Sequence, residues 1–440
     1  MNTAQPVMLE SFPQAILHFD GDAFFTSVEQ SLHPQYRNKP VVTGAERGII
    51  ACASYEAKRL GIKRGVALHD ARRMCPGLIV LPSDYETYSM MSKRLYEIVR
   101  RWTPVVEEWS VDEGFADLTG MRRLHRCSYE QMGRDIQCTI AAELGLTVSI
   151  GISLSKGLAK LCSKFRKPNG FTAVRGRHIH LLLQLHKLKD VWGFGSNTVA
   201  FLEKQGLRTA YDFIMRSEQW VASRMSKTQV EIWHELRGRS VYPVTTEEKT
   251  DYATVSKCKS FTGPNADVNF IWAKLVRNLE SAFIKLRRHR LKAKLLTVGL
   301  RLNDFRQTGV EGRLNRATSA PAEALPLLRT LFERIYEPGA AYRATMVCLG
   351  KISTDATDQL DLFEDRLRIE KMEASARVVD RVAEVFGKHK LSQGSSLFLD
   401  QHAITPRDTL PWRKLNLLPG ETERQRVGIP MLGGRCSRGR

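Results

Sequence analysis

The stretch Ile16-Leu17-His18-Phe19-Asp20-Gly21-Asp22 is an apolar, strand-like run that ends on acidic residues. A second stretch, Trp109-Ser110-Val111-Asp112-Glu113-Gly114-Phe115, places two further acids between apolar, strand-like segments. Carboxylates at such positions are costly to bury without a cation. Clustered carboxylates are also the ligands that Mg²⁺ prefers, and they leave room on the ion for substrate phosphates. The two stretches therefore predict phosphoryl transfer assisted by two metal ions.

The overall charge of the chain favours a polyanionic partner. Its 440 residues include 67 lysines and arginines against 47 aspartates and glutamates, which gives a formal net charge of +20. A field of this sign suits nucleic acid or an anionic membrane surface. No apolar run approaches the length of a membrane span, and the N-terminal residues lack the order of a signal peptide, so we expect no membrane association. The 8 cysteines are scattered without a CxxC pair, as expected of free thiols in a reducing cytoplasm.

The order of the expected elements indicates an α+β chain of several domains. Residues 15–165 alternate short apolar strands with amphipathic helices, which is typical of a mainly antiparallel sheet with helices on one face. Residues 175–238 are short helices joined by glycine turns, and a polar linker follows. The next elements have the βαββαβ order of a ferredoxin-like domain: strand 252–262, helix 267–289, strand 294–303, strand 312–318, helix 322–336 and strand 342–352. A further helix is expected near residues 374–386.

Five motifs occur in the order and approximate spacing of the Y-family (translesion) DNA polymerases. They are Asp20-Gly21-Asp22-Ala23-Phe24-Phe25, Ser54-Tyr55-Glu56-Ala57-Lys58, Ser110-Val111-Asp112-Glu113, Gly151-Ile152-Ser153 and Lys167-Pro168-Asn169-Gly170. The chain resembles this family from residue 14 to about residue 350. Phe25 and Tyr55 are similar to the DinB branch, whereas Trp192-Gly193, the stretch 116–120 and the layout after residue 340 are similar to UmuC. The resemblance therefore implies a DinB-like catalytic core with some UmuC-like features in the C-terminal part, and the branch itself stays open.

The resemblance implies a right-hand polymerase with a ferredoxin-like palm, small fingers, a helical thumb and a βαββαβ little finger. The expected boundaries are 1–23 and 84–174 for the catalytic palm, 24–83 for the fingers, 175–240 for the thumb with a helix-hairpin-helix, 241–251 for a linker, 252–353 for the little finger, and 354–440 for a C-terminal tail.

The resemblance also implies template-directed, Mg²⁺-dependent transfer of a nucleotide from a dNTP to a primer 3′-hydroxyl. Synthesis would be distributive and of low fidelity, in the tolerance and repair of DNA damage. Asp20 and Asp112 would bridge two Mg²⁺ ions, Glu113 would bind the catalytic ion, and the Gly21 carbonyl would bind the nucleotide ion. The pattern gives Asp22 no firm ligand role, and a structural or solvated carboxylate explains it at least as well.

Several aromatic and basic residues are expected around the nucleotide. Phe25 matches the steric gate, the aromatic ring under the incoming sugar, while a core position is expected for the adjacent Phe24. Ile49 and Ala51 align with residues that roof the templating base. The expected dNTP-binding set is Phe24, Phe25, Cys52, Tyr55, Lys58 and Lys160.

Three of these residues would neutralise the charge that develops on pyrophosphate: Tyr55, Lys58 and Lys160. The family usually carries arginine at the position of Lys58, so Arg59 is an alternative contact, and a hydroxyl residue is commoner at the position of Cys52. Lys156 lies on the same helical face as Lys160 and is expected to be a solvated charge.

Two regions are expected to contact the DNA backbone. Trp192-Gly193-Phe194-Gly195 resembles a helix-hairpin-helix turn, in which Gly193 and Gly195 let backbone N–H groups approach a phosphate, although a plain turn is the alternative. In the little finger, Lys257, Lys259 and Arg301 would follow the duplex backbone, unless they are only solvated charges.

The segment Gln359-Leu360-Asp361-Leu362-Phe363 places apolar side chains in acidic, polar surroundings. It resembles the sliding-clamp-binding peptide of bacterial polymerases, in which Leu360, Leu362 and Phe363 fill an apolar pocket and Gln359 bonds at its rim. The alternative is a hydrophobic staple for the tail. The implied partners are primer–template DNA, dNTP, the bacterial sliding clamp and other damage-response proteins. The protein would act as a monomer in the cytoplasm, associated with the nucleoid when active.

Two other functions fit part of the sequence. A catalytically silent scaffold that binds DNA and the clamp would not need to keep Asp20, Asp112 and Glu113. A nucleotide cyclase with a similar palm would not explain the thumb, the little finger or the clamp peptide. The polymerase therefore remains the expected function.

Overall fold

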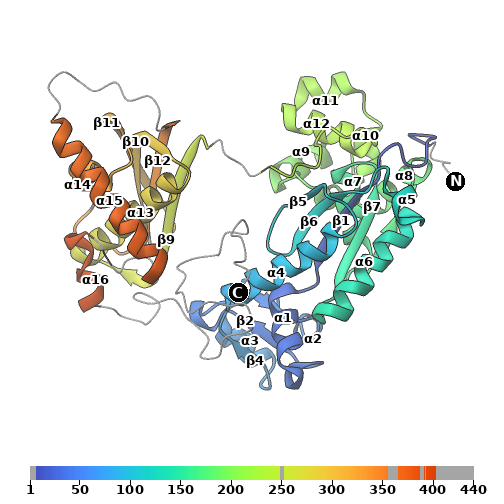
Figure 1. The fold of residues 1–440 in the computed structure, drawn as a ribbon, viewed down its shortest axis with the longest axis horizontal. Coiled ribbons are helices and arrows are strands. Elements are labelled where there is room, and N and C mark those ends of the chain that lie inside the picture. The colour runs from blue at the N-terminus through green and yellow to red at the C-terminus, as the bar shows by residue number, and fades with distance from the viewer. Residues whose placement is uncertain (1–5, 248–251, 355–364, 387–390, 392, 403–440) are drawn as a thin grey trace. The chain divides into compact units, whose positions relative to one another are not determined.

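The computed structural model describes residues 6–247, 252–354, 365–386, 391 and 393–402. Contacts divide the chain into a first unit that ends at Glu247 and a second unit that begins after it (Figure 1). This division falls inside the linker expected at 241–251. No helix among the described residues combines the length and the apolar character that a membrane span requires.

A mostly antiparallel sheet forms the centre of the first unit. Its strand order is β5-β6-β1-β7-β8, and only β8 runs parallel to its neighbour β7. The strands are β1 (Ile16–Gly21), β5 (Val106–Glu108), β6 (Glu113–Asp117), β7 (Val148–Ser153) and β8 (Phe171–Ala173). The central strand β1 is apolar along most of its length because helices cover both of its faces.

The helices over this central sheet divide between its two faces. Leu17 and Phe19 belong to the core formed with α4 (Tyr85–Arg100) and α6 (Tyr129–Leu144). Ile16 points to the other face and packs against Ala159 of α7 (Lys156–Phe165). The expectation of helices on one face is therefore wrong, because α7 follows β7 through a short turn and folds back over the second face.

Gly151 of β7 allows α7 to lie very close to this second face. A Cβ atom at Gly151 would lie 2.1 Å from the carbonyl oxygen of Ala159 and 2.3 Å from the backbone nitrogen of Ser163. Only a residue without a side chain fits such an approach. Gly151 pairs with His18 of β1, so the close packing brings α7 next to the acidic end of β1.

A small sheet with the order β3-β2-β4 has its own apolar core, to which Val42, Ile50 and Ala57 belong. The elements of this region are α1 (Phe24–Leu32), β2 (Val41–Thr43), β3 (Cys52–Ala53), α2 (Tyr55–Arg59), α3 (Leu68–Met74) and β4 (Ile79–Leu81). α5 (Met121–His125) lies between β6 and α6, and short 3₁₀ turns occur at Pro34–Tyr36, Ala45–Arg47, Gly176–His178 and Leu188–Asp190.

The rest of the first unit is helical, as expected. It contains α8 (Ile179–Leu185), α9 (Ser196–Lys204), α10 (Ala210–Ile214), α11 (Glu218–Arg224) and α12 (Lys227–Leu236). Glu235 of α12 is 1% exposed and ties this region to α7, because its Oε2 accepts the Gly157 N–H at 2.9 Å. The same carboxylate accepts the N–H groups of Val241 and Tyr242 through Oε1, so the start of the expected linker is fixed to α12.

The second unit confirms the βαββαβ order. Its elements are β9 (Thr254–Asn265), α13 (Val268–Arg288), β10 (Leu291–Leu302), β11 (Gln307–Thr318), α14 (Pro321–Ile335) and β12 (Tyr342–Thr354). The strands form an antiparallel sheet in the order β11-β10-β12-β9. Leu296, Val298 and Leu300 of β10 point into the core that this sheet forms with α13 and α14.

The helix expected near 374–386 begins earlier, as α15 (Arg366–Phe386). It is held to the second unit by Asp380, which accepts from Arg287 Nε and Nη2 at 2.6 and 2.7 Å. A second ion pair joins Glu373 to Lys292 at 3.2 Å. A 3₁₀ turn (Gly394–Ser396) and α16 (Phe398–Gln401) follow, and both lie against α13.

Candidate active site

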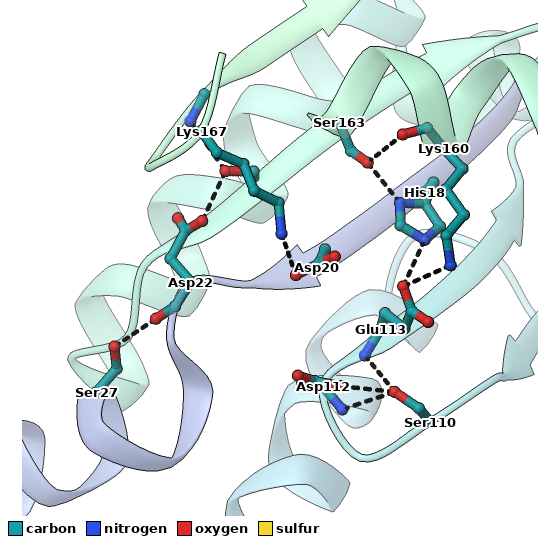
Figure 2. Close-up of polar contacts among 12 residues, drawn as sticks. His18, Asp20, Asp22, Ser27, Ser110, Asp112, Glu113, Lys160, Ser163 and Lys167 are labelled. Carbon is teal, nitrogen blue, oxygen red and sulfur yellow. Dashed lines mark hydrogen bonds and ion pairs between the residues drawn. The ribbon is translucent and has the colours of Figure 1, made fainter. Parts of the chain in front are cut away.

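The strands β1 and β6 bring the two acidic motifs together (Figure 2). Asp20 is paired with Glu113 in the antiparallel register, and the Gly21 N–H donates to the carbonyl oxygen of Asp112 at 2.7 Å. Directly paired residues on neighbouring strands point to the same face of a sheet. Asp20 and Glu113 therefore share the α7 face, with Asp112 adjacent to both.

Glu113 lies among nitrogen-bearing side chains. Its Oε2 accepts from Lys160 Nζ at 2.8 Å and lies 3.4 Å from His18 Nε2. Burial opposes ionisation of this carboxyl, but His18 and Lys160 together lower its pKa well below the ordinary range. Glu113 is therefore ionised at neutral pH.

Asp112 has the opposite environment. Burial raises its pKa, and the nearby carboxylates of Asp20 and Glu113 raise it further, while the Ser110 hydroxyl, which donates to Oδ1 at 2.6 Å, lowers it. A buried carboxyl next to two others is stabilised as an anion when a cation joins the group. This is the electrostatic property that a divalent metal site requires.

In the described structure, lysine side chains are paired with two of the acids. Lys167 forms an ion pair with Asp20, and Lys160 forms one with Glu113. Among the described residues, no three His, Cys, Asp or Glu side chains are grouped closely enough to hold a metal ion. The oxygen donors on adjoining strands fit a hard cation such as Mg²⁺, provided that these two lysines move away from the carboxylates.

His18 is a site residue that the sequence interpretation missed. Its ring is fully buried, and Nδ1 lies 2.7 Å from Ser163 Oγ, whose hydroxyl donates to the Lys160 carbonyl oxygen at 3.0 Å. Burial lowers the pKa of His18, so the ring is neutral and Lys160 is the cation that keeps Glu113 ionised. The available signal was a titratable residue inside an apolar strand, two positions from Asp20 and hence on the same face.

Asp22 is a structural carboxylate rather than a solvated one. It is 1% exposed and accepts from Ser149 Oγ at 2.8 Å and from the Asn169 N–H at 2.6 Å. Burial raises its pKa, although both hydrogen bonds act in the other direction. Figure 2 shows its side chain turned toward the loop that carries Lys167.

The two phenylalanines after the first acidic motif have different environments. Phe24 is 3% exposed and belongs to the core under α4, as the sequence indicates. Phe25 is partly buried, and its ring stacks on Tyr88 with 4.5 Å between centroids and 13° between planes. Tyr85 meets the same ring edge-on at 5.6 Å. The orientation of the Phe25 ring is therefore fixed by two neighbours from α4.

Two of the expected phosphate contacts, Tyr55 and Lys58, lie together on α2. Tyr55, at the start of α2, lies close to the acids: burial raises its pKa, and the charges of Asp22 and Asp20 raise it further. Lys58 Nζ lies 4.1 Å above the Tyr55 ring. Cys52 Sγ lies 3.8 Å from Thr26 Oγ1.

The residues expected at the templating base, and Lys156, have the following environments. Ile49 is 46% exposed, and Ala51 donates its N–H to the Thr43 carbonyl at 2.8 Å. The expectation that Lys156 is solvated is wrong, because this lysine is 4% exposed and paired with Glu107.

The two glycines of the helical region lie at the start of α9. Gly193 has a φ of +88°, and Gly195 is the N-cap residue of α9 with no atom near the position of a Cβ. A turn that leads directly into a helix N-terminus has the backbone geometry of a phosphate contact.

The basic residues expected on the little finger do not share one surface. Lys257 and Lys259 pair with Val347 and Thr345, and Thr345 accepts a hydrogen bond from Asn278 of α13. Both lysines therefore lie on the helix side of the edge strand β9. Arg301 lies on the opposite face, where it pairs with Ala344 and donates to Gln307 at 3.0 Å. The clamp peptide at 359–363 lies outside the described residues.

Comparison with known proteins identifies close family relationships. The impB/mucB/samB family model matches residues 19–164, and the model of the C-terminal domain of this family matches residues 253–362. The DNA polymerase IV of Listeria monocytogenes is 30% identical over 361 residues, which cover 81% of this chain and 98% of that relative. The DNA polymerase IV of Clostridium kluyveri is 27% identical over 389 residues, covering 87% of this chain and 96% of the relative.

Solved structures with the same fold include a Y-family DNA polymerase chimera. It superposes with a TM-score of 0.66 at 23% sequence identity, covering 77% of this chain and 99% of the chimera. An insertion ternary complex of Dbh DNA polymerase gives a TM-score of 0.52 at 23% identity. These similarities confirm the expected α+β polymerase fold.

Proposed function

The chain belongs to the impB/mucB/samB family of Y-family, translesion DNA polymerases, and from this premise we propose that its β1–β6 acids form a two-metal nucleotidyl-transfer site. The protein is a DNA-directed DNA polymerase that uses dNTPs on primer–template DNA and depends on a divalent metal. We further infer that synthesis is distributive and of low fidelity, and that the protein acts as a monomer in the cytoplasm, at the nucleoid. The alternative of a silent scaffold is not favoured.

Asp20, Asp112, Glu113 and the Gly21 carbonyl would hold the two Mg²⁺ ions. The observation that supports this assignment is the pairing of Asp20 with Glu113, while Gly21 is hydrogen-bonded to Asp112. When bound, the ions lower the pKa of the primer 3′-hydroxyl and stabilise negative charge on the triphosphate. The residues of the chain supply ionised oxygen ligands at fixed positions on two adjoining strands.

Lys160 has two tasks in this proposal. Without a nucleotide, its ammonium keeps Glu113 ionised at 2.8 Å. When the acids bind cations, the same ammonium becomes available to a triphosphate oxygen, because its stem rises from α7 on the face that carries the acids. The raised pKa keeps the Tyr55 hydroxyl protonated, so it remains a hydrogen-bond donor to phosphate. Lys58, stacked on the Tyr55 ring, would add a second positive charge.

Phe25 would be the steric gate under the incoming sugar. Its ring cannot turn away easily, since Tyr88 is stacked on one face and Tyr85 meets it edge-on. A fixed ring at this position leaves no room for a 2′-hydroxyl. The half-exposed Ile49 and the small Ala51 would roof the templating base, where open space accommodates a damaged base.

DNA and clamp contacts complete the proposal. The N–H groups around Gly193 and Gly195 would hold a backbone phosphate at the N-terminus of α9, and Arg301 would contact the duplex from the open face of its sheet. The peptide Gln359-Leu360-Asp361-Leu362-Phe363 would bind the bacterial sliding clamp, on the strength of its apolar residues in acidic surroundings.

Primer extension with Mg²⁺ tests the catalytic assignment directly. We expect Asp112→Asn to reduce kcat/KM by at least about 100-fold, since one of the carboxylates that would hold the ions is lost. Asp117→Asn is the matched control, because Asp117 lies on the same strand at the far end from the acids, paired with Ile16. An Asp112→Asn enzyme within about tenfold of wild type would contradict the two-metal site.

A further inference from the structure

The Lys167-Pro168-Asn169-Gly170 motif has no role in the catalytic proposal, but its lysine contacts one of the proposed metal ligands. Lys167 Nζ contacts Asp20 Oδ1, and the two side chains are 27% and 22% exposed (Figure 2). Lys167 and Asp20 are far apart in the sequence, and the contact exists only because the loop after α7 returns to the end of β1. An ammonium group thus lies on the oxygen that a cation would use.

The loop that carries Lys167 is held firmly. Asp22 accepts the Asn169 N–H at 2.6 Å and the Ser149 hydroxyl at 2.8 Å, while Ser149 Oγ accepts the Gly170 N–H at 3.3 Å. Gln137 of α6 donates to the Gly170 carbonyl at 3.2 Å and to Asn169 Oδ1 at 3.3 Å. A buried carboxylate that accepts a backbone N–H makes a strong, directional anchor. The loop backbone is therefore fixed while the Lys167 side chain stays free to turn.

We propose that Lys167 is a counter-ion for Asp20 in the metal-free polymerase, which a divalent cation must displace before this carboxylate can bind it. The inference rests on the proposed role of Asp20 as a metal ligand. The displaced ammonium has access to solvent, so displacement needs only a rotation of the side chain. The loop anchored by Asp22 returns the ammonium to the same oxygen when the cation leaves. Lys167 is thus a positioning residue that weakens cation binding by the free enzyme.

The Lys167 ammonium and a divalent ion compete for Asp20, so removal of the ammonium should increase the affinity of the site for the ion. Two opposite charges in contact attract each other, but partial exposure and salt reduce that attraction strongly. Removing the ammonium should still leave Asp20 more available to a divalent ion. It should also increase the negative potential that Asp112 and Glu113 create around the site.

The test is a titration of the full-length protein with Mn²⁺, followed by electron paramagnetic resonance, without DNA or dNTP. We expect Lys167→Met to bind Mn²⁺ at least about threefold more tightly than wild type. Lys164→Met is the matched control, since Lys164 forms a similar pair at 2.9 Å with Asp190, which is not one of the proposed metal ligands, and it should leave the affinity unchanged. Lys167→Arg keeps the positive charge and should bind Mn²⁺ no more tightly than wild type.

Combination with Asp112→Asn separates this inference from the catalytic proposal. If Asp112→Asn weakens Mn²⁺ binding but Lys167→Met does not strengthen it, the counter-ion role is overturned and the metal site stands. If Asp112→Asn changes nothing in either background, the ion binds elsewhere and both proposals fail. Circular dichroism checks that each variant is folded. Should Lys167→Met not fold, Mn²⁺ binding by Lys167→Arg that is tighter than wild type would overturn the inference.

Discussion

Gly151→Ala tests how the active site depends on the packing of α7 on the central sheet. The added Cβ would lie 2.1 Å from the Ala159 carbonyl oxygen and 2.3 Å from the Ser163 nitrogen. Both atoms belong to the helix backbone, so no side chain can rotate out of the way. Ordinary contacts are about 3.5 Å or longer, and α7 must therefore move outward by roughly 1 Å.

This shift predicts two separable effects. Overpacking of this kind costs about 1–3 kcal/mol, which corresponds to a decrease of about 2–10 °C in the Tm of a unit of this size. α7 also carries Lys160 and Ser163, which contact Glu113 and His18. A displacement of about 1 Å in such groups typically costs up to about 100-fold in rate, so kcat/KM for dNTP insertion should fall by more than the stability loss alone explains.

Differential scanning calorimetry and steady-state primer extension measure the two effects, at a temperature where both proteins are folded. Gly77→Ala is the control, because no atom lies within 4 Å of its added Cβ and its backbone is not in the left-handed region. A Gly151→Ala protein with a Tm within about 1 °C of wild type and unchanged kcat/KM would refute the argument, since α7 would then not rest on Gly151.

Three further predictions concern other parts of the chain. Phe25→Ala should raise ribonucleotide insertion by at least about tenfold relative to dNTP insertion, because the ring stacked on Tyr88 no longer blocks a 2′-hydroxyl; unchanged rNTP/dNTP selectivity would remove the steric-gate assignment. Leu362→Ala combined with Phe363→Ala should abolish stimulation by the sliding clamp and spare clamp-independent primer extension, whereas loss of both activities or of neither would count against clamp binding. Asp380→Ala should destabilise the attachment of α15 by about 1–2 kcal/mol and speed hydrogen exchange across α15, since Arg287 loses both of its bonds to this carboxylate. Arg366→Ala, which breaks an exposed pair with Glu370 on the same helix, is the control and should leave that exchange unchanged.

The sequence predicted the elements whose apolar residues follow a clear period. The helices α13 and α14 and the strand β10 lie within a few residues of their expected bounds, because apolar residues recur along the whole length of each element. β11 begins at Gln307 rather than 312, since this edge strand is exposed at Gln307 and Glu311 and carries little apolar alternation there. α15 begins at Arg366 rather than 374 for a similar reason, because its first turns are exposed and charged.

The sequence predicted those parts of the candidate site in which acidic residues follow apolar strands. Acids at the ends of two strands pointed to a shared site, and the antiparallel register of β1 with β6 brings them side by side. The faces of Lys257 and Lys259 were not predictable, because a shift of one residue in the pairing of β9 would exchange the two faces. The contacts of His18 and Lys167 depend on packing between segments far apart in the chain, which a period within one segment cannot reveal.

The contacts of α7 and of the loop that follows it explain why the motifs at 20–25, 151–153 and 167–170 occur in one chain. Gly151 admits α7 to the sheet, α7 presents Lys160 to Glu113, and the next loop presents Lys167 to Asp20. Asp22, in the first acidic motif, anchors that loop through Asn169. One continuous segment thus balances the charge of acids that come from two other strands. Lys160 and Lys167 are therefore expected to leave these acids when metal binds, and substitutions of these two lysines should alter metal affinity even though they leave the acids untouched.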